Sequence, residues 1–173
     1  AALAFAKAIQ HSALPSVFPT YPNRKEFEIY ATMHTAKEVG GDFYDFYFVD
    51  EDNLAFLIAD VSGKGIPAAM FMMQSKTIIK SCAESGMSIE QVFTVANEKL
   101  CEGNDAGMFV TAWMGILNTK TGKVLFANAG HNPPLVKHAD GTYEYLKSRA
   151  GFVLAGMEGV RYRKNELDLA PGD

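Results

Sequence analysis

Two aspartates, Asp42 and Asp60, occupy positions where a carboxylate is unfavourable unless it has a chemical task. Asp42 follows a Gly-Gly pair, and Asp60 ends the apolar run "LAFLIA" at 54–59. Burying an unpaired charge is very unfavourable, so such a carboxylate needs a cation, backbone N–H donors or a metal ion as its partner. Two carboxylates and a carbonyl from the following turn would give an all-oxygen ligand set, which selects Mg²⁺ or Mn²⁺. The aspartate pair is therefore a candidate metal centre.

The elements around the two aspartates predict that their side chains meet. Apolar runs at 43–49 and 54–59, separated by the turn cluster "DEDN", predict an antiparallel β-hairpin. Counted from a turn centre near Asp52, Asp42 lies ten residues back and Asp60 eight residues forward. Both would lie at the same end of the hairpin, with a bulge at the glycines absorbing the difference. A cation between them would offset their mutual repulsion.

A helix that follows the second strand offers another role for Asp60. The segment "SGKG" leads into Ile66-Pro67, and proline is well tolerated in the first turn of a helix. Asp60 or Ser62 would then cap this helix by accepting hydrogen bonds from its first N–H groups. The local pattern favours the two roles equally, and the neighbouring Asp42 shifts the balance towards the metal centre.

The rest of the chain alternates irregularly between helical and extended patterns, which predicts an α+β fold with a mainly antiparallel sheet. Phe5, Ile9 and Ala13 form a helical stripe near the N-terminus, and Ser88 with Gln91 forms a capping box. Further helices are expected at 66–85 and 88–103. Strands are expected at 27–35, 108–118 and 123–130, with short ones at 143–146 and 162–169.

Composition bounds the function classes. A chain of 173 residues fits one domain, and a net charge of −4 argues against a protein that binds the nucleic-acid backbone. No apolar run reaches the length of a membrane span, and no signal peptide is visible. Cys82 and Cys101 lack metal-ligand spacing, which favours reduced thiols in a cytoplasmic protein. The chain opens without Met and closes on "LAPGD", so we expect it to be a piece of a longer protein.

Several other polar residues are weaker candidates. Asp45 lies three positions after Asp42, so a strand turns it away and a supporting role is favoured. Asn128, His131 and Asn132 lie in "NAGHNPP", a Gly/Pro turn in which a structural role is favoured. A lysine in the helix-entry turn, Lys64, would either attract a phosphate group or simply be solvated.

The ordered set of motifs resembles a known family. "EVGGDFYDFY", "LAFLIADVSGKGIPAAMFM", "MFVTAWMGILNTKTGKVLFANAGHNPPLV" and "LAPGD" are similar to motifs of the SpoIIE/RsbU-type branch of the PPM (type 2C-like) metal-dependent serine/threonine phosphatases. The resemblance covers residues 27–173 and implies an αββα sandwich of two mainly antiparallel sheets flanked by helices. It divides the chain into an N-terminal linker helix and connector, 1–22, and a phosphatase domain, 23–173.

The same resemblance implies site roles. Asp42 would ligate one Mn²⁺ or Mg²⁺ ion, Asp60 would bridge two ions, and Val61 would add its backbone carbonyl. A metal-activated water would attack phosphorus without a protein nucleophile. The family pattern continues beyond "PGD" with a Thr-Asp-Gly segment and a later aspartate that complete the second metal site. This chain ends at Asp173, before either, which leaves the activity of these 173 residues open.

By resemblance, the expected function is hydrolysis of phosphoserine or phosphothreonine on a regulatory protein, such as an anti-sigma factor antagonist. The N-terminal helix would receive a signal from an upstream sensor domain and would allow a homodimer. The alternative is an inactive domain of the same fold that binds a partner protein in signalling. A nucleotide cyclase, suggested by "GGD", is disfavoured because Phe43 stands where that signature has an acidic residue.

Overall fold

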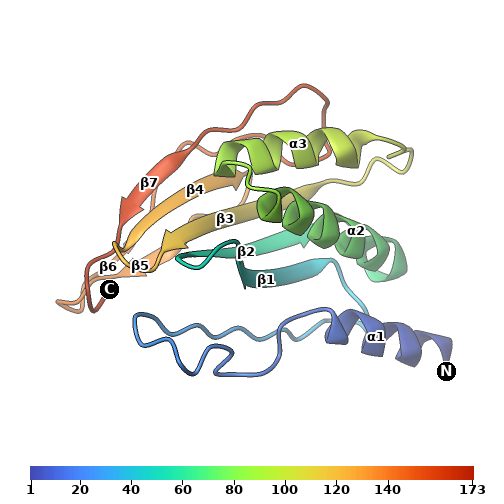
Figure 1. The fold of residues 1–173 in the computed structure, drawn as a ribbon. Coiled ribbons are helices and arrows are strands. Elements are labelled where there is room, and N and C mark those ends of the chain that lie inside the picture. The colour runs from blue at the N-terminus through green and yellow to red at the C-terminus, as the bar shows by residue number, and fades with distance from the viewer.

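The computed structural model describes residues 1–173 as three helices and seven strands (Figure 1). Five strands form one antiparallel sheet in the order β1-β2-β3-β4-β7, and β5 and β6 form a separate antiparallel pair. This confirms the α+β class. None of the three helices combines the length and the apolar character that a membrane span requires. The elements are α1 Ala2–Ser12, β1 Asp42–Phe48, β2 Asn53–Val61, α2 Gly65–Glu84, α3 Ile89–Cys101, β3 Val110–Asn118, β4 Lys123–Ala129, β5 Leu135–Lys137, β6 Tyr143–Tyr145 and β7 Asn165–Asp168.

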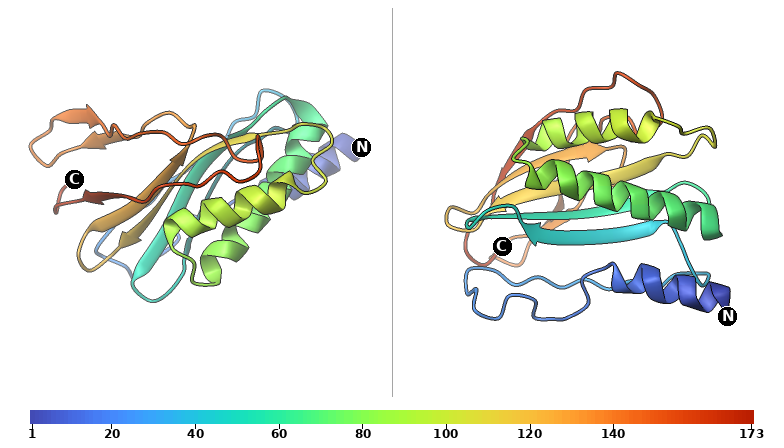
Figure 2. Two further views of the ribbon diagram at one scale, coloured as in Figure 1. Left: turned by 90° about the horizontal axis from the view of Figure 1, so that it is seen from above. Right: turned by 45° about the vertical axis from the view of Figure 1, so that its right-hand side comes forward.

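Helices α2 and α3 cover one face of the large sheet (Figures 1 and 2). Alternate strand residues, among them Phe43, Leu57 and Met114, are buried against these helices in the main hydrophobic core. The predicted capping box at the start of α3 is present, with Ser88 and Gln91 satisfying each other's backbone N–H groups. The face of the sheet that α2 and α3 cover therefore forms the hydrophobic core. A functional site that solvent can reach must lie on the other face or at an edge of the sheet.

The N-terminal helix and the segment that follows it lie on the opposite side of β1 (Figure 2). Aromatic contacts hold this segment in place, with the Phe18 ring 5.8 Å from Phe46 and the Tyr21 ring 4.9 Å from Phe48. The strand predicted at 27–35 is wrong, because these residues make no backbone–backbone hydrogen bond to any other segment. An apolar pattern is insufficient for a strand, which also needs a partner to complete its ladder.

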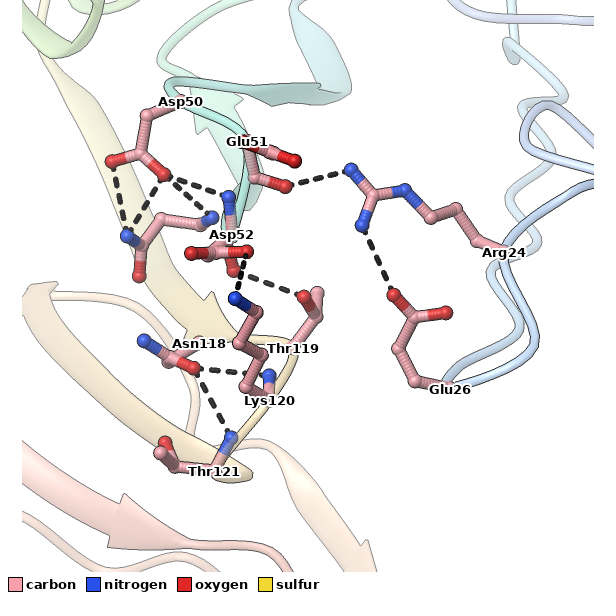
Figure 3. Close-up of polar contacts among 10 residues, drawn as sticks. Arg24, Glu26, Asp50, Glu51, Asp52, Asn118, Thr119, Lys120 and Thr121 are labelled. Carbon is pink, nitrogen blue, oxygen red and sulfur yellow. Dashed lines mark hydrogen bonds and ion pairs between the residues drawn. The ribbon is translucent and has the colours of Figure 1, made fainter.

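Polar contacts fix the turn between β1 and β2, at the end of the hairpin remote from the two aspartates (Figure 3). The Asp50 carboxylate accepts hydrogen bonds from the backbone N–H groups of Asp52 and Asn53, each at 2.9 Å. Arg24 donates to the Glu51 carbonyl at 2.7 Å, which ties the N-terminal segment to the turn. Because turn geometry sets the register of a hairpin, these contacts also decide which residues face each other at its far end.

Candidate metal centre

Asp42 and Asp60 are direct cross-strand partners. The pairs from Phe48↔Leu54 to Asp42↔Asp60 centre on Glu51, so each aspartate lies nine residues from the turn centre. The predicted bulge at the glycines is therefore wrong. It was needed only because the predicted turn centre, Asp52, lies one residue after the actual centre, Glu51. Directly opposed residues project from the same face, with Cβ atoms about 4.5–5.5 Å apart. The predicted proximity of the two carboxylates is confirmed, and their role as metal ligands stays a prediction.

The backbone carbonyl of Val61 lies close to the loop that leads into Asp42. A Cβ atom on Gly41 would stand 2.9 Å from the Val61 carbonyl oxygen and 2.9 Å from its Cβ, so only glycine permits this approach. The Val61 N–H donates to the Gly41 carbonyl at 3.3 Å, which holds the two backbones together. The "GGD" and "ADV" motifs therefore meet through a close backbone contact.

The carboxylates of Asp42 and Asp60 repel each other when both are ionised. Burial and, next, the facing Asp60 carboxylate together raise the pKa of Asp42 to about 6, and His131 opposes the shift. Both aspartates line a cavity of about 460 Å³, together with Lys37 and Lys64. A cation seated between the carboxylates would remove the repulsion that raises this pKa.

The ligand atoms that these residues offer are of the kind that a hard divalent cation binds. Two facing carboxylates and a nearby carbonyl are oxygen donors, which Mg²⁺ and Mn²⁺ prefer, and Mg²⁺ usually retains several waters in its shell. No group of three or more His, Cys, Asp or Glu side chains is arranged to hold a metal ion. Asp42, Asp60 and Val61 would therefore supply at most part of a coordination shell, and the remaining positions would go to water or substrate oxygens.

Helix capping does not explain Asp60. The N-cap of α2 is Lys64, and no side chain makes a capping hydrogen bond there. The Ser62 hydroxyl instead accepts a hydrogen bond at 2.9 Å from the N–H of Phe109, the residue before β3. The alternative that Asp60 or Ser62 caps the helix is therefore wrong. The expectation that Asp60 is a buried charge is also wrong, because Asp42 and Asp60 are both exposed, and what a cation would offset is the repulsion between the two facing carboxylates.

Asp45 lies on the helix-covered face, as its spacing from Asp42 predicts. Its carboxylate is 3.2 Å from the Lys76 ammonium of α2, and its other oxygen accepts the Phe46 N–H at 3.0 Å. Burial raises the pKa of Asp45, and Lys76 opposes that shift. Asp45 therefore joins β1 to α2 and points away from the candidate metal centre.

The structure brings His131 to the same end of the sheet as the two aspartates. Its Nδ1 lies 2.9 Å from the hydroxyl of Thr111, which is the β3 partner of Asp60. Burial lowers the pKa of His131, while the charge of Asp42 raises it. Asn132 of the same loop is exposed. Sequence reasoning missed Thr111 altogether, because only the strand order β2-β3 places it opposite Asp60.

The raised pKa of Asp42 predicts an unusual stability change in Asp42→Asn without metal. Because the folded pKa lies above the ordinary value of 3.8, this group's contribution to stability falls as pH rises from about 4 to 6. At pH 7.5 in EDTA the variant should be more stable than the wild type, by about 1 kcal/mol after allowance for solvent screening. Urea denaturation at pH 7.5 and pH 4 measures both values, and the advantage should vanish at pH 4.

The control for this prediction is Asp105→Asn, since Asp105 is exposed and forms no ion pair. Its stability should follow the wild type at both pH values. If Asp42→Asn proved less stable than the wild type at pH 7.5, the two carboxylates would not repel each other as the geometry requires.

Comparison with known structures places this architecture among the PP2C-type domains. The SiaA-PP2C domain of Pseudomonas aeruginosa superposes with a TM-score of 0.78 at 23% identity, over 99% of this chain and 67% of that one, which shows a shared fold. Residues 50–173 match the family model described as Stage II sporulation protein E (SpoIIE). The chain belongs to the SpoIIE family.

Two curated relatives support this assignment. Phosphoserine phosphatase RsbU of Bacillus subtilis is 33% identical over 153 residues, which cover 88% of this chain and 45% of that protein. Protein IcfG of Synechocystis sp. is 29% identical over 194 residues, covering 96% of this chain and 30% of that protein. The chain thus spans less than half of the length of these relatives.

Proposed function

We propose that this chain is a metal-dependent phosphatase domain that hydrolyses phosphoserine or phosphothreonine on a regulatory protein. The observation that carries the proposal is the direct pairing of Asp42 and Asp60, two carboxylates on one face with no cationic side chain paired to either. The identity of 33% with a phosphoserine phosphatase supports the same reaction class. An anti-sigma factor antagonist in the cytoplasm is the kind of substrate we propose.

Asp42, Asp60 and the Val61 carbonyl would hold Mn²⁺ or Mg²⁺ at the sheet edge. When bound, such an ion supplies a water of lowered pKa that can attack phosphorus. The chain's own contribution is to fix the oxygen ligands on two hydrogen-bonded strands, which keeps their separation constant. Lys37 and Lys64 line the same cavity and would attract the phosphate group of the substrate.

We further propose that α1 couples the site to an upstream sensor domain. The buried Gln10 side chain donates to the Gly40 carbonyl at 2.6 Å and accepts the Gly40 N–H at 3.1 Å, two residues before Asp42. On the other face of α1, Phe5 is 70% exposed and Ile9 52% exposed, an apolar stripe suited to an upstream helix or a second copy. Residues 1–22 would then act as linker and 23–173 as the phosphatase domain.

Metal-dependent phosphate release tests the proposed function. The full-length protein should release phosphate from a phosphoserine protein in Mn²⁺ and lose that activity in EDTA. Mn²⁺ at 100 times its dissociation constant should also stabilise the fold by about 2.7 kcal/mol, measured by thermal denaturation. Phosphate release that is undiminished in EDTA would refute the metal mechanism.

A partner-binding domain without catalysis is the second candidate, favoured by the lack of a third acidic or His side chain close enough to complete a cluster. On that account, Mn²⁺ would neither raise the melting temperature nor stimulate phosphate release. The two measurements together therefore separate the candidates.

A further inference from the structure

Beyond the carboxylate pair, we propose that His131 and Thr111 form the phosphate-binding edge of the site. His131 would donate a hydrogen bond from Nε2 to an oxygen of the substrate's phosphoryl group, and Thr111 would position the imidazole ring. This inference rests on the proposed function. It assigns phosphate binding to the side of the site that the proposed metal ligands do not occupy.

The strand register places these residues in one row across the sheet. Asp42 pairs with Asp60, and Asp60 pairs with Thr111, so the three side chains project from the same face at the same level. Neighbouring strands lie about 4.7–4.9 Å apart, which sets the step along the row. The Thr111 hydroxyl contacts the His131 ring at 2.9 Å and extends the row by one more polar group.

The backbone around His131 is fixed without help from its ring. The side-chain amide of Asn128 donates to the His131 carbonyl at 2.9 Å and accepts the His131 N–H at 2.7 Å. Asn128 is itself buried, at 6% exposure. Because the turn is already held through the backbone, the imidazole is not needed to stabilise it. The ring is instead held by its own contact to Thr111, as a side chain with a separate task would be.

The tautomer follows from the contact to Thr111. If the Thr111 hydroxyl donates to Nδ1, the ring proton resides on Nε2, which becomes a hydrogen-bond donor with no partner in the protein. A phosphomonoester presents several anionic oxygens, and those that a cation at Asp42 and Asp60 left free would need other hydrogen-bond donors. A neutral donor beside the row, on Thr111, would bind one of the remaining oxygens, as electrostatic stabilisation of phosphoryl transfer requires.

Inorganic phosphate and a phosphoserine peptide, assayed on the full-length protein in Mn²⁺, test this assignment. His131→Ala should raise the inhibition constant of phosphate and the KM of the peptide by about 10- to 100-fold, the range for a hydrogen bond to a charged group. Thr111→Val, which keeps the side-chain shape, should raise both constants by a smaller factor. The Mn²⁺ dissociation constant should change much less than the phosphate constants in both variants, since neither residue is among the proposed ligands Asp42, Asp60 and Val61.

His138→Ala and Thr119→Val are matched controls. His138 is exposed and bonds Glu144, and Thr119 bonds a turn carbonyl at the far end of the sheet. Both controls should keep wild-type constants. If the phosphate inhibition constant of Thr111→Val and of His131→Ala equalled that of an active wild type, the proposal would be overturned. A wild type that neither binds Mn²⁺ nor releases phosphate would overturn the proposed function itself, and this inference with it.

Discussion

Asp60→Asn is expected to lower kcat/KM for Mn²⁺-dependent phosphate release by about 10²- to 10³-fold. The substitution keeps the size of the side chain and removes its charge, so the sheet edge should retain its shape. Metal ions contribute several kcal/mol of charge stabilisation in the transition state, and each 1.36 kcal/mol corresponds to tenfold in rate. Because Asp60 faces Asp42 directly, the loss of its charge removes half of the anionic ligand pair.

Steady-state kinetics at saturating Mn²⁺, together with a Mn²⁺ titration, measures this effect. Asp105→Asn is the matched control, since it makes the same chemical change at an exposed position. In EDTA the melting temperature of Asp60→Asn should not fall below that of the wild type, which separates loss of function from loss of fold. Undiminished turnover of Asp60→Asn would refute the metal mechanism.

Lys76→Met is expected to destabilise the fold by about 3–5 kcal/mol at pH 7, the range for removing one partner of a buried ion pair. Asp45 is only 3% exposed and Lys76 lies 3.2 Å from it, with a side chain that is itself 13% exposed. Methionine preserves the length and apolar contacts of the lysine stem. The variant therefore leaves a carboxylate under the helices with the Phe46 N–H as its nearest hydrogen-bond donor.

Urea denaturation measures this loss, and its pH dependence identifies the cause. Burial already raises the pKa of Asp45, and removal of Lys76 takes away the largest opposing influence, leaving those of Lys80 and the Phe46 N–H. The folded variant would then bind a proton more tightly than the unfolded chain, so its deficit should shrink as pH falls towards 4. Measurements at pH 7 and pH 4.5 should show the difference.

Two further variants bracket the Lys76 prediction. The double variant Asp45→Asn/Lys76→Met should recover much of the stability, because it removes the unpaired charge. Lys123→Met, which breaks an exposed pair with Glu166 at 3.3 Å, should change stability by less than about 1 kcal/mol. Equal small effects of the Lys76 and Lys123 substitutions would contradict the assignment of Asp45 and Lys76 as a buried ion pair.

The sequence was most informative where local pattern and tertiary role agree. The hairpin that carries Asp42 and Asp60 follows from two apolar runs around a turn cluster, and the turn contacts preserve that pattern in three dimensions. The segment 27–35 has a similar pattern but no ladder partner, so its extended shape did not become a strand. Capping by Asp60 was plausible from local sequence alone, and the actual position of the helix start at Lys64 excluded it.

The remainder of the site depends on contacts between distant segments. Thr111 lies opposite Asp60 because β3 pairs with the free edge of β2, a strand order that no local pattern specifies. His131 joins the row through its contact to Thr111, and Gln10 reaches Gly40 across thirty residues. Such side chains carry no periodic signal, so sequence reasoning identified His131 only as part of a turn.

The pairing of β1 with β2 also constrains how the length of this chain can vary among related sequences. Side chains alternate between the two faces, so one residue inserted within 43–48 or 54–59 would move an aspartate to the helix-covered side. An insertion within 49–53 leaves the ladder intact and only enlarges the loop. Insertions and deletions in this hairpin should therefore collect at the turn, while the spacing from each aspartate to the end of its strand stays constant.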